Sequence, residues 1–315
     1  NKVHTLSLSP ESVGKFHDMK IAYTPLHGAG VRLVPASLRK WGFTNVSLVE
    51  EQAVIDGNFP TVESPNPEER KTMAKAIELG SRLGADLVLA TDPDSDRIGV
   101  ALRNAKGEYV LLNGNQTLSL IMAYQLTRWS ELGRLDGKEF VVKTIVTSQM
   151  PNVMAAHFGV KCYDCLTGFK YIARIIRNNE GKATYIGGGE ESFGYLAGDF
   201  VRDKDAVSAC SLVAEAAAWT RDTMGLTLYE WLQKLYVEFG FFREGLVSVV
   251  RKGMEGAAEI QQMMVDYRAD PPREIAGSPV VKINDFKLLE STDVRTGAKT
   301  PIEEEASNVL QWFAA

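Results

Sequence analysis

The 315-residue sequence has few cysteines, no excess of positive charge and no long apolar run. Three cysteines (Cys162, Cys165 and Cys210) are too few for a disulfide framework and are typical of a reducing compartment. The formal net charge of −5 argues against nucleic acid and anionic lipid as partners. No stretch approaches the roughly 20 consecutive apolar residues that a membrane-spanning helix needs. We therefore expect a cytoplasmic globular protein that contacts neither nucleic acid nor membrane.

Cys162 and Cys165 have the spacing of a redox motif or of half a zinc site. The sequence has no second pair of this kind, and its four histidines are scattered. Ordinary cysteines of the core or of strand ends are therefore the favoured interpretation.

Short apolar segments alternate with helical patterns over the first 245 residues. This alternation predicts an α/β fold of consecutive β/α domains, with mixed, mostly parallel sheets sandwiched by helices. Beyond Gly245 the pattern predicts a strand over 246–251, a helix over 256–268 and a strand over 278–283, as in a partial C-terminal α+β domain. We expect three domains, over residues 1–137, 138–245 and 246–315.

Proline and glycine lead to two local expectations. Pro67 is expected to open a helix over residues 67–83, because proline is favoured in the first helical turn. Gly187-Gly-Gly189 is expected to form a loop after a strand over residues 183–187.

The segment Asp92-Pro-Asp-Ser-Asp-Arg97 directly follows an apolar stretch that reads as a strand. In an extended chain, the carboxylates of Asp92, Asp94 and Asp96 would project to the same side. Like charges at that spacing repel, and a divalent cation is the usual means of holding them together. An oxygen-only ligand set favours Mg²⁺ or Mn²⁺. The segment therefore predicts a metal site.

Three other interpretations use the same residues. A solvated acidic turn is the simplest, since Asp and Pro are common in turns. A calcium loop starting at Asp92 would need Gly and Glu where Arg97 and Arg103 stand, so it is excluded. A phosphatase of the haloacid-dehalogenase type, with Asp92 as its nucleophile, remains as the alternative.

Polar residues next to glycines form a second candidate loop. In Gly187-Gly-Gly-Glu-Glu-Ser-Phe-Gly194, the side chains of Glu190 and Ser192 are suited to contact sugar hydroxyl groups. As an isolated motif, the same residues would also fit an acidic turn.

Three lysines stand at positions where an anion would be a natural partner. Lys143 interrupts an apolar strand, so it should emerge at a sheet edge or face an anion. Lys170 lies at the start of a helix, whose free amides favour phosphate. Lys204 stands between Asp203 and Asp205, and its plain interpretation is a surface cation paired with one of them.

Taken in order, these segments resemble the α-D-phosphohexomutase family, which includes phosphoglucomutase and phosphomannomutase. Six matches between residues 23 and 205 are far more specific than any single one. They are Tyr-Thr-Pro-Leu-His-Gly-Ala-Gly at 23–30, Phe-Pro-Thr-Val with Pro-Asn-Pro-Glu at 59–68, Asp-Pro-Asp-Ser-Asp-Arg at 92–97, Thr-Gly-Phe-Lys at 167–170, Gly-Glu-Glu-Ser-Phe-Gly at 189–194 and Arg-Asp-Lys-Asp at 202–205.

The resemblance implies a four-domain enzyme, of which this chain would be the second, the third and part of the fourth domain. The family's phosphoserine loop would lie on a preceding domain, and the terminal phosphate-binding loop would follow. Ser64-Pro-Asn-Pro67 mimics the serine loop, but its place matches a different family motif, so Ser64 is not expected to be the nucleophile. We expect the chain alone to be inactive and to need the missing domains.

The resemblance also implies an activity and a role for each candidate residue. The activity is interconversion of hexose 1-phosphate and hexose 6-phosphate, with glucose favoured over mannose, through a phosphoserine and a bisphosphorylated sugar. One Mg²⁺ and an activator of the glucose 1,6-bisphosphate type would be required. The metal ligands would be Asp92, Asp94 and Asp96, the catalytic residues Arg97 and Lys204, and the substrate-binding residues Lys143, Lys170, Glu190 and Ser192.

Overall fold

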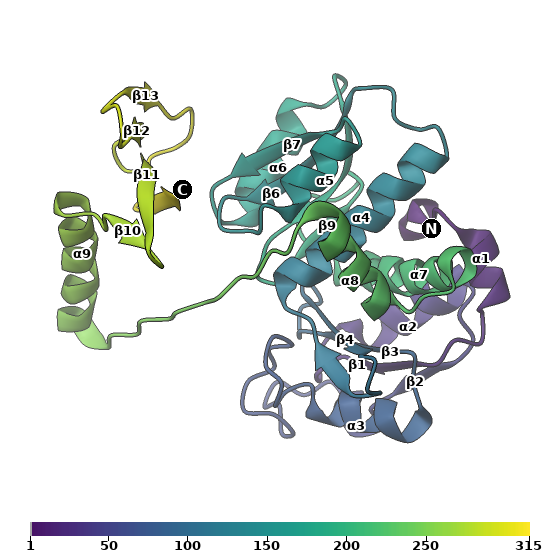
Figure 1. The fold of residues 1–315 in the computed structure, drawn as a ribbon. Helices are drawn as coiled ribbons and strands as arrows, with labels where there is room; N and C mark the ends of the chain where they lie inside the picture. Colours follow the sequence, from purple (N-terminus) through teal and green to yellow (C-terminus); the bar gives the residue numbers. More distant parts are fainter. Residues whose placement is uncertain (1) are drawn as a thin grey trace. The chain divides into compact units, whose positions relative to one another are not determined.

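The computed structural model describes residues 2–315 in two units, which meet between Glu244 and Gly245 and are described separately. The first unit contains two mixed sheets covered by helices, and the second contains one helix and an antiparallel sheet (Figure 1). This arrangement confirms the predicted α/β class, with an α+β unit at the C-terminal end.

The first sheet has the strand order β2-β1-β3-β4-β5. Its central strand β1 pairs in parallel with β2 and β3, whereas β4 and β5 continue the sheet antiparallel. Helix α3 covers one face and helix α2 the other. The bounds are β1 (Ile21–Thr24), α2 (Gly30–Trp41), β2 (Val46–Leu48), η2 (Glu50–Gln52), α3 (Ala74–Leu83), β3 (Leu87–Thr91), β4 (Ile98–Arg103) and β5 (Tyr109–Leu111).

The second sheet has the order β7-β6-β8-β9, with β9 antiparallel to β8 and the other pairs parallel. Apolar residues of α6 pack on one face, and α4 and α5 pack on the other. The bounds are α4 (Gly114–Glu131), β6 (Glu139–Thr144), α5 (Met150–His157), β7 (Lys161–Cys165), α6 (Phe169–Asn178), β8 (Thr184–Gly189) and β9 (Tyr195–Ala197).

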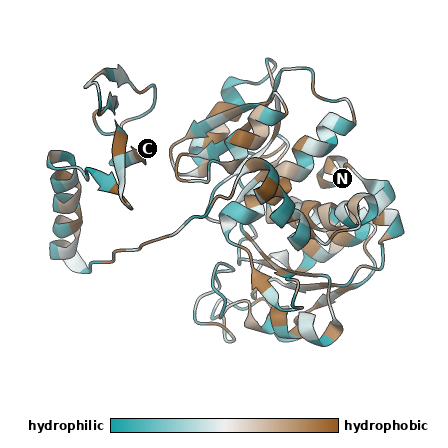
Figure 2. Ribbon diagram, in the orientation of Figure 1, coloured by the Kyte–Doolittle hydropathy of each residue, from teal (hydrophilic) through white to brown (hydrophobic). Residues whose placement is uncertain are grey.

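Helix α7 (Ala206–Met224) joins the two sheets into one core. It packs against α2 and α1 (Pro10–Lys15) on the side of the first sheet, and against α4 and β9 on the side of the second. Helix α8 (Leu228–Phe239) and the 3-10 helix η1 (Val3–Leu6) also pack on α7. Figure 2 shows hydrophobic stretches in the strands and mixed colours along the covering helices. No helix within residues 2–315 is long and apolar enough to cross a membrane.

The second unit consists of α9 (Gly253–Ala269) and five antiparallel strands. They are β10 (Glu274–Ile275), β11 (Ser278–Asp285), β12 (Glu290–Asp293), β13 (Lys299–Pro301) and β14 (Leu310–Ala314). The expected strand over 246–251 is wrong, because residues 240–252 form neither helix nor strand. Leu246 and Val247 are each 88% exposed. The segment is apolar enough for a strand, but a strand also needs a neighbouring strand to pair with, and this segment pairs with none.

The helix expected to open at Pro67 begins only at Ala74, and residues 67–73 form turns. Side chains hold the preceding loop instead: Asn66 Oδ1 accepts the N–H of Glu68 at 3.1 Å, and Thr72 Oγ1 donates to the carbonyl of Ser64 at 2.9 Å. Such local side-chain bonds compete with helix formation.

The three glycines expected in a loop lie in β8, which runs to Gly189. Their role is close approach within the sheet. A Cβ on Gly188 would lie 2.2 Å from the carbonyl oxygen of Val142, so no larger residue fits there. The prediction of a loop over Gly187–Gly189 was wrong, because glycine is favoured both in turns and where two backbones lie too close together for a side chain.

A buried carboxylate fixes the N-terminal segment to this core. The Glu215 side chain on α7 accepts hydrogen bonds from Ser7 Oγ, from the N–H groups of Leu8 and Ser9 at 2.9 and 3.1 Å, and from the Tyr124 hydroxyl at 2.8 Å. Glu215 is completely buried, so removal of its carboxylate would leave these buried donors without a hydrogen-bond acceptor.

We therefore expect Glu215→Ala to lower the free energy of unfolding by about 3 kcal/mol. The change is measured by urea denaturation at neutral pH. The control is Glu78→Ala, which removes an exposed carboxylate from α3 and should change stability by less than about 0.5 kcal/mol. A similar small loss in both variants would contradict the anchoring role of Glu215.

Candidate active site

The aspartate loop follows β3 and folds back on itself before β4. Ser95 has a left-handed backbone (φ 61°), and its N–H donates to the carbonyl of Asp92 at 3.1 Å. Asp92 Oδ1 accepts the N–H groups of Asp96 and Arg97, both at 3.0 Å. The loop is therefore a tight turn closed by its own first carboxylate.

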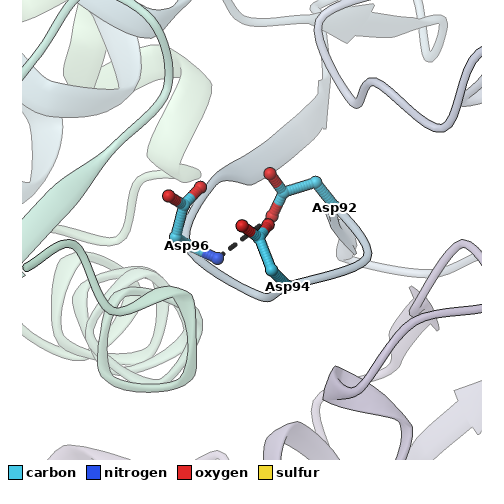
Figure 3. Close-up of side chains that lie close together, drawn as sticks. All are labelled: Asp92, Asp94 and Asp96. Atoms are coloured by element: carbon cyan, nitrogen blue, oxygen red, sulfur yellow. Dashed lines mark hydrogen bonds between the residues drawn. The ribbon is translucent and has the colours of Figure 1, made fainter.

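This turn brings together the three predicted metal ligands. Asp92, Asp94 and Asp96 each offer a carboxylate oxygen, and these oxygens lie within 4.8 Å of one another (Figure 3). The expectation that an extended chain would align them is wrong, because the folded turn does so. Asp92 is buried, Asp96 is half-buried and Asp94 is exposed, so the cluster opens to solvent on one side.

Burial raises the pKa of Asp92 to about 7. The hydrogen bond from the Arg97 N–H acts in the opposite direction, and the neighbouring carboxylates of Asp96 and Asp94 raise the pKa further. A carboxylate that is half protonated near neutral pH needs a cation beside it to stay ionised.

Arg97 lies against these carboxylates. Its Nε is 3.4 Å from Asp92 Oδ2 and 3.6 Å from Asp96 Oδ1, and another guanidinium nitrogen is 3.4 Å from Glu68 Oε1. Glu68 was not among the predicted site residues, although it belongs to the Pro-Asn-Pro-Glu segment. Its contact with Arg97 crosses between two loops, which spacing along the chain does not reveal.

Lys204 is a second cation at the cluster. Its Nζ lies 3.0 Å from Asp96 Oδ2, 3.1 Å from Asp203 Oδ1 and 5.2 Å from the centre of the Phe169 ring. The expected pairing with Asp203 is present, but Lys204 also reaches the aspartate loop. Burial acts to lower the pKa of Lys204, but the hydrogen bonds and charges of Asp96 and Asp203 together outweigh burial and leave the pKa raised, so Lys204 is a cation at neutral pH.

A cavity of about 540 Å³ opens beside these groups. It lies between the start of α2, the aspartate loop and the segment that precedes α7. The residues that line it are Ala29, Leu33, Asp94, Ser95, Val201, Arg202, Asp203, Lys204, Asp205 and Val207.

The loop before α2 packs against the aspartate loop at Pro93. The Ala29 N–H donates to the Pro93 carbonyl at 2.8 Å, and a Cβ on Gly28 would lie 2.3 Å from Pro93 Cα. His27 is buried, with Nδ1 2.9 Å from the Val54 carbonyl and Nε2 2.8 Å from Thr61 Oγ1. These supporting roles were not predicted, because they depend on contacts between segments that are distant in the sequence.

The predicted sugar loop is joined to the aspartate loop by backbone pairing. Arg97 and Gly194 form an antiparallel bridge, and the Ile98 N–H donates to the Phe193 carbonyl at 3.0 Å. Glu190 is buried, and its Oε1 accepts the Gly168 N–H at 2.8 Å. Burial raises the pKa of Glu190, while the Gly168 bond and the charge of Lys204 oppose the rise.

The other three predicted substrate-binding residues differ in how exposed they are. Ser192 is half-buried in the sugar loop. Lys143 is completely buried, and its Nζ lies 3.0 Å from Asp164 Oδ1, so the anion it faces belongs to the neighbouring strand. Lys170 is exposed at the start of α6. In the structure, Arg97 and Lys204 therefore contact the aspartate loop. Lys143 instead is buried in an ion pair with Asp164.

The chemistry of the loop fits a divalent cation. All three ligands are carboxylate oxygens, which hard cations prefer. Among the described residues, Asp96 Oδ1 and Ser95 Oγ are buried without a hydrogen-bond partner. A bound ion would satisfy Asp96 Oδ1 and replace the long contact with Arg97.

Two family models match the first unit. Residues 4–107 match the phosphoglucomutase/phosphomannomutase alpha/beta/alpha domain II, and residues 113–239 match domain III. The chain therefore belongs to the α-D-phosphohexomutase family. The matches do not favour the phosphatase alternative, and the predicted domain boundaries at 137 and 245 stay a prediction.

The chain is similar to phosphoglucomutase from Staphylococcus aureus (strain MRSA252), with 35% identity over 294 residues, 93% of this chain and 52% of that protein. The fold resembles the open form of pp63/parafusin, a phosphoglucomutase from Paramecium (TM-score 0.62, 14% identity, 99% of this chain and 50% of that one). It also resembles Aspergillus fumigatus N-acetylphosphoglucosamine mutase in complex with GlcNAc-6P and magnesium (TM-score 0.50, 15% identity, 74% and 52%). The chain spans about half the length of these proteins.

Metal affinity should depend on pH through Asp92. A divalent cation binds the ionised carboxylate, so with a pKa of about 7 the affinity should fall roughly tenfold from pH 8 to pH 6. The affinity for Mn²⁺ is measured by electron paramagnetic resonance at both pH values. Asp92→Asn has no ionisable group at this position and should bind weakly, without this pH dependence. A wild-type affinity that is equal at pH 6 and pH 8 would contradict the assignment.

Lys204 should compete with the metal for Asp96. We expect Lys204→Met to tighten Mn²⁺ binding roughly fivefold, because it removes a positive charge 3.0 Å from a ligand oxygen. Lys204→Arg keeps the charge and serves as the matched control, with an affinity close to that of the wild type. Unchanged or weaker binding in Lys204→Met, measured by titration calorimetry, would show that the lysine is no competitor.

Proposed function

We propose that this chain forms the metal- and sugar-binding part of a phosphohexomutase, which interconverts hexose 1-phosphate and hexose 6-phosphate. One observation supports this most strongly: the aspartate loop and the predicted sugar loop are joined by the Arg97–Gly194 bridge, and Lys204 lies against Asp96 beside them. Groups suited to a phosphate and groups suited to a sugar therefore meet in one unit, as transfer between two positions of one sugar requires.

In this proposal, Asp92, Asp94 and Asp96 hold one Mg²⁺, which supplies positive charge to the transferring phosphoryl group. Arg97 is oriented by Glu68 and adds a fixed positive charge beside the ion. Lys204 contacts phosphate or transfers a proton at the substrate oxygen. Because its Nζ is shared between Asp96 and Asp203, it can turn toward a ligand without leaving all its partners.

The ligand contacts are assigned to Glu190, Ser192 and Lys170, whereas Lys143, which was also expected to bind substrate, is paired with Asp164. Glu190 is held in place by the Gly168 N–H, which leaves its second carboxylate oxygen for a hydroxyl group. Lys170 is exposed and suited to a phosphate. Lys143 would need to leave Asp164 to contact a ligand, so its role in this structure is to support the end of β6.

The transfer would pass through a phosphoserine on a domain outside this chain and a bisphosphorylated sugar, with an activator of the glucose 1,6-bisphosphate type. The name of the 35%-identical relative supports glucose over mannose as the hexose. The magnesium and GlcNAc-6P of the Aspergillus neighbour support Mg²⁺ and a hexose phosphate as ligands. The small number of cysteines, none of which forms a disulfide in the described residues, supports a reducing, cytoplasmic location.

Asp94→Ala in the full-length protein should lower kcat by more than about a hundredfold, because it removes one ligand of the ion that stabilises the phosphoryl group. Asp94 is exposed, so the fold should be retained, as checked by circular dichroism. The control is Asp18→Ala, an exposed aspartate before β1, which should keep full activity. Retained turnover in Asp94→Ala would rule out the metal assignment.

The 315-residue chain should show no isomerisation of glucose 1-phosphate by itself, because the phosphoryl donor is expected on another domain. Conversion is measured by a coupled assay for glucose 6-phosphate, with the full-length protein as the positive control. Measurable turnover by the chain alone would place the donor within these residues and contradict the proposed division of roles.

A further inference from the structure

Glu191 stands between the two residues expected to contact the sugar, but its own side chain reaches another loop. Its Oε2 accepts hydrogen bonds from the hydroxyl of Thr144 at 2.7 Å and from the hydroxyl of Thr147 at 3.0 Å. Thr144 is the last residue of β6, and Thr147 lies in the turn that follows. Both threonines are buried, and a carboxylate offers acceptors only, which matches two hydroxyl donors. One side chain thus joins the turn to the sugar loop, defined here as residues 190–194.

The same turn is held by the buried cation of Lys143. Its Nζ lies 3.3 Å from the carbonyl oxygen of Thr144 and 3.4 Å from that of Thr147. The ion pair with Asp164 at 3.0 Å adds a further acceptor. Carbonyl groups of the turn therefore bind a buried ammonium, while its hydroxyl groups bind Glu191. A buried charge is costly to separate from its acceptors, so the turn is a fixed support for the sugar loop.

The start of α4 contacts both the turn and the sugar loop. A Cβ on Gly114, the first residue of α4, would lie 1.8 Å from the carbonyl oxygen of Glu191. Asn115 Oδ1 accepts the N–H of Ser148 at 2.8 Å. The close packing at Gly114 leaves the sugar loop no room to move toward α4, and the hydrogen bonds of Glu191 oppose movement away from the turn.

The position of the sugar loop depends on such contacts, because residues 190–193 form neither helix nor strand. The two neighbouring carboxylates accept from different loops. Glu190 Oε1 accepts the Gly168 N–H at 2.8 Å, and Glu191 accepts the two threonine hydroxyls. Groups that bind a substrate are effective only when they are held within about 0.5 Å of their productive positions.

We propose that Glu191 is a positioning residue of the sugar loop. Through the hydroxyls of Thr144 and Thr147 it holds Glu190 and Ser192 in place, and it thereby sets the affinity for the sugar. The inference rests on the proposed function for the identity of the substrate. The contacts that hold the loop do not depend on that function, so they can be tested without it.

The first test measures hydrogen exchange in the 315-residue chain. The Glu190 N–H donates to the Gly194 carbonyl at 2.9 Å across the sugar loop, so its protection reports on the order of the loop. Glu191→Leu should lower this protection about tenfold, whereas Glu191→Gln keeps a carbonyl acceptor and should lower it less than about twofold. Glu238→Leu removes an exposed carboxylate from α8 and is the matched control, with protection equal to that of the wild type. Equal protection in Glu191→Leu and the wild type would overturn the inference.

The second test separates positioning from direct contact with the substrate, by kinetics of the full-length protein. Thr144→Val/Thr147→Val removes the two donors and leaves Glu191 unchanged. This variant and Glu191→Leu should each raise KM for glucose 1-phosphate about tenfold, and their combination should raise it no further, because all three side chains act as one unit. Glu191→Gln should restore KM to within about twofold of the wild type, and no variant should change the Mg²⁺ concentration for half-maximal activity by more than about twofold.

A raised KM in Glu191→Leu with a normal KM in the threonine variant would show that Glu191 contacts the sugar itself, and would overturn the positioning role. Thr147→Val alone, with an expected rise in KM of about threefold, replaces the double variant if that protein does not fold. Absence of turnover by the wild-type full-length protein would contradict only the proposed function. The protection of the Glu190 amide then still supports or overturns the role of Glu191.

Discussion

The repulsion among three carboxylates on one short loop is the constraint on which the rest of the first unit depends. Their oxygens lie within 4.8 Å of one another, and the first carboxylate is buried. Such a cluster is stable only if cations face it or if protons neutralise part of it. Arg97 and Lys204 supply positive charge here, and the pKa of Asp92 is still raised to about 7, chiefly by burial and further by the neighbouring carboxylates. A divalent cation bound by the three aspartates would complete the charge balance.

The core packing of α7 determines where this charge balance can form. The helix begins directly after Asp205, whose carboxylate caps it by accepting the N–H groups of Val207 and Ser208. The Ala206 N–H donates to the Ser95 carbonyl at 3.0 Å, which ties the start of α7 to the aspartate loop. Because α7 packs against helices of both sheets, one buried element fixes Lys204 relative to the three aspartates.

The proposed binding of phosphate by an acidic chain would rely on the placement of a few cations and not on the net charge. Lys143 is neutralised by Asp164 inside the sheet, and Lys204 is shared between two aspartates. Lys170 and Arg177 instead remain exposed on α6. Partnered cations thus orient the loops, whereas the exposed cations are the ones available to a ligand.

The sequence by itself determined most elements, because their signals are local. The helices over Gly30–Trp41 and Phe169–Asn178, the cap at Asp205 and the acidic residues of the metal loop all follow from neighbouring residues. Tertiary structure alone decided the turn that gathers the aspartates, the strand formed by Gly187–Gly189, and the partners of Lys143, Arg97 and Lys204. These features depend on contacts between segments far apart in the chain, and residue spacing carries no information about which distant groups will meet.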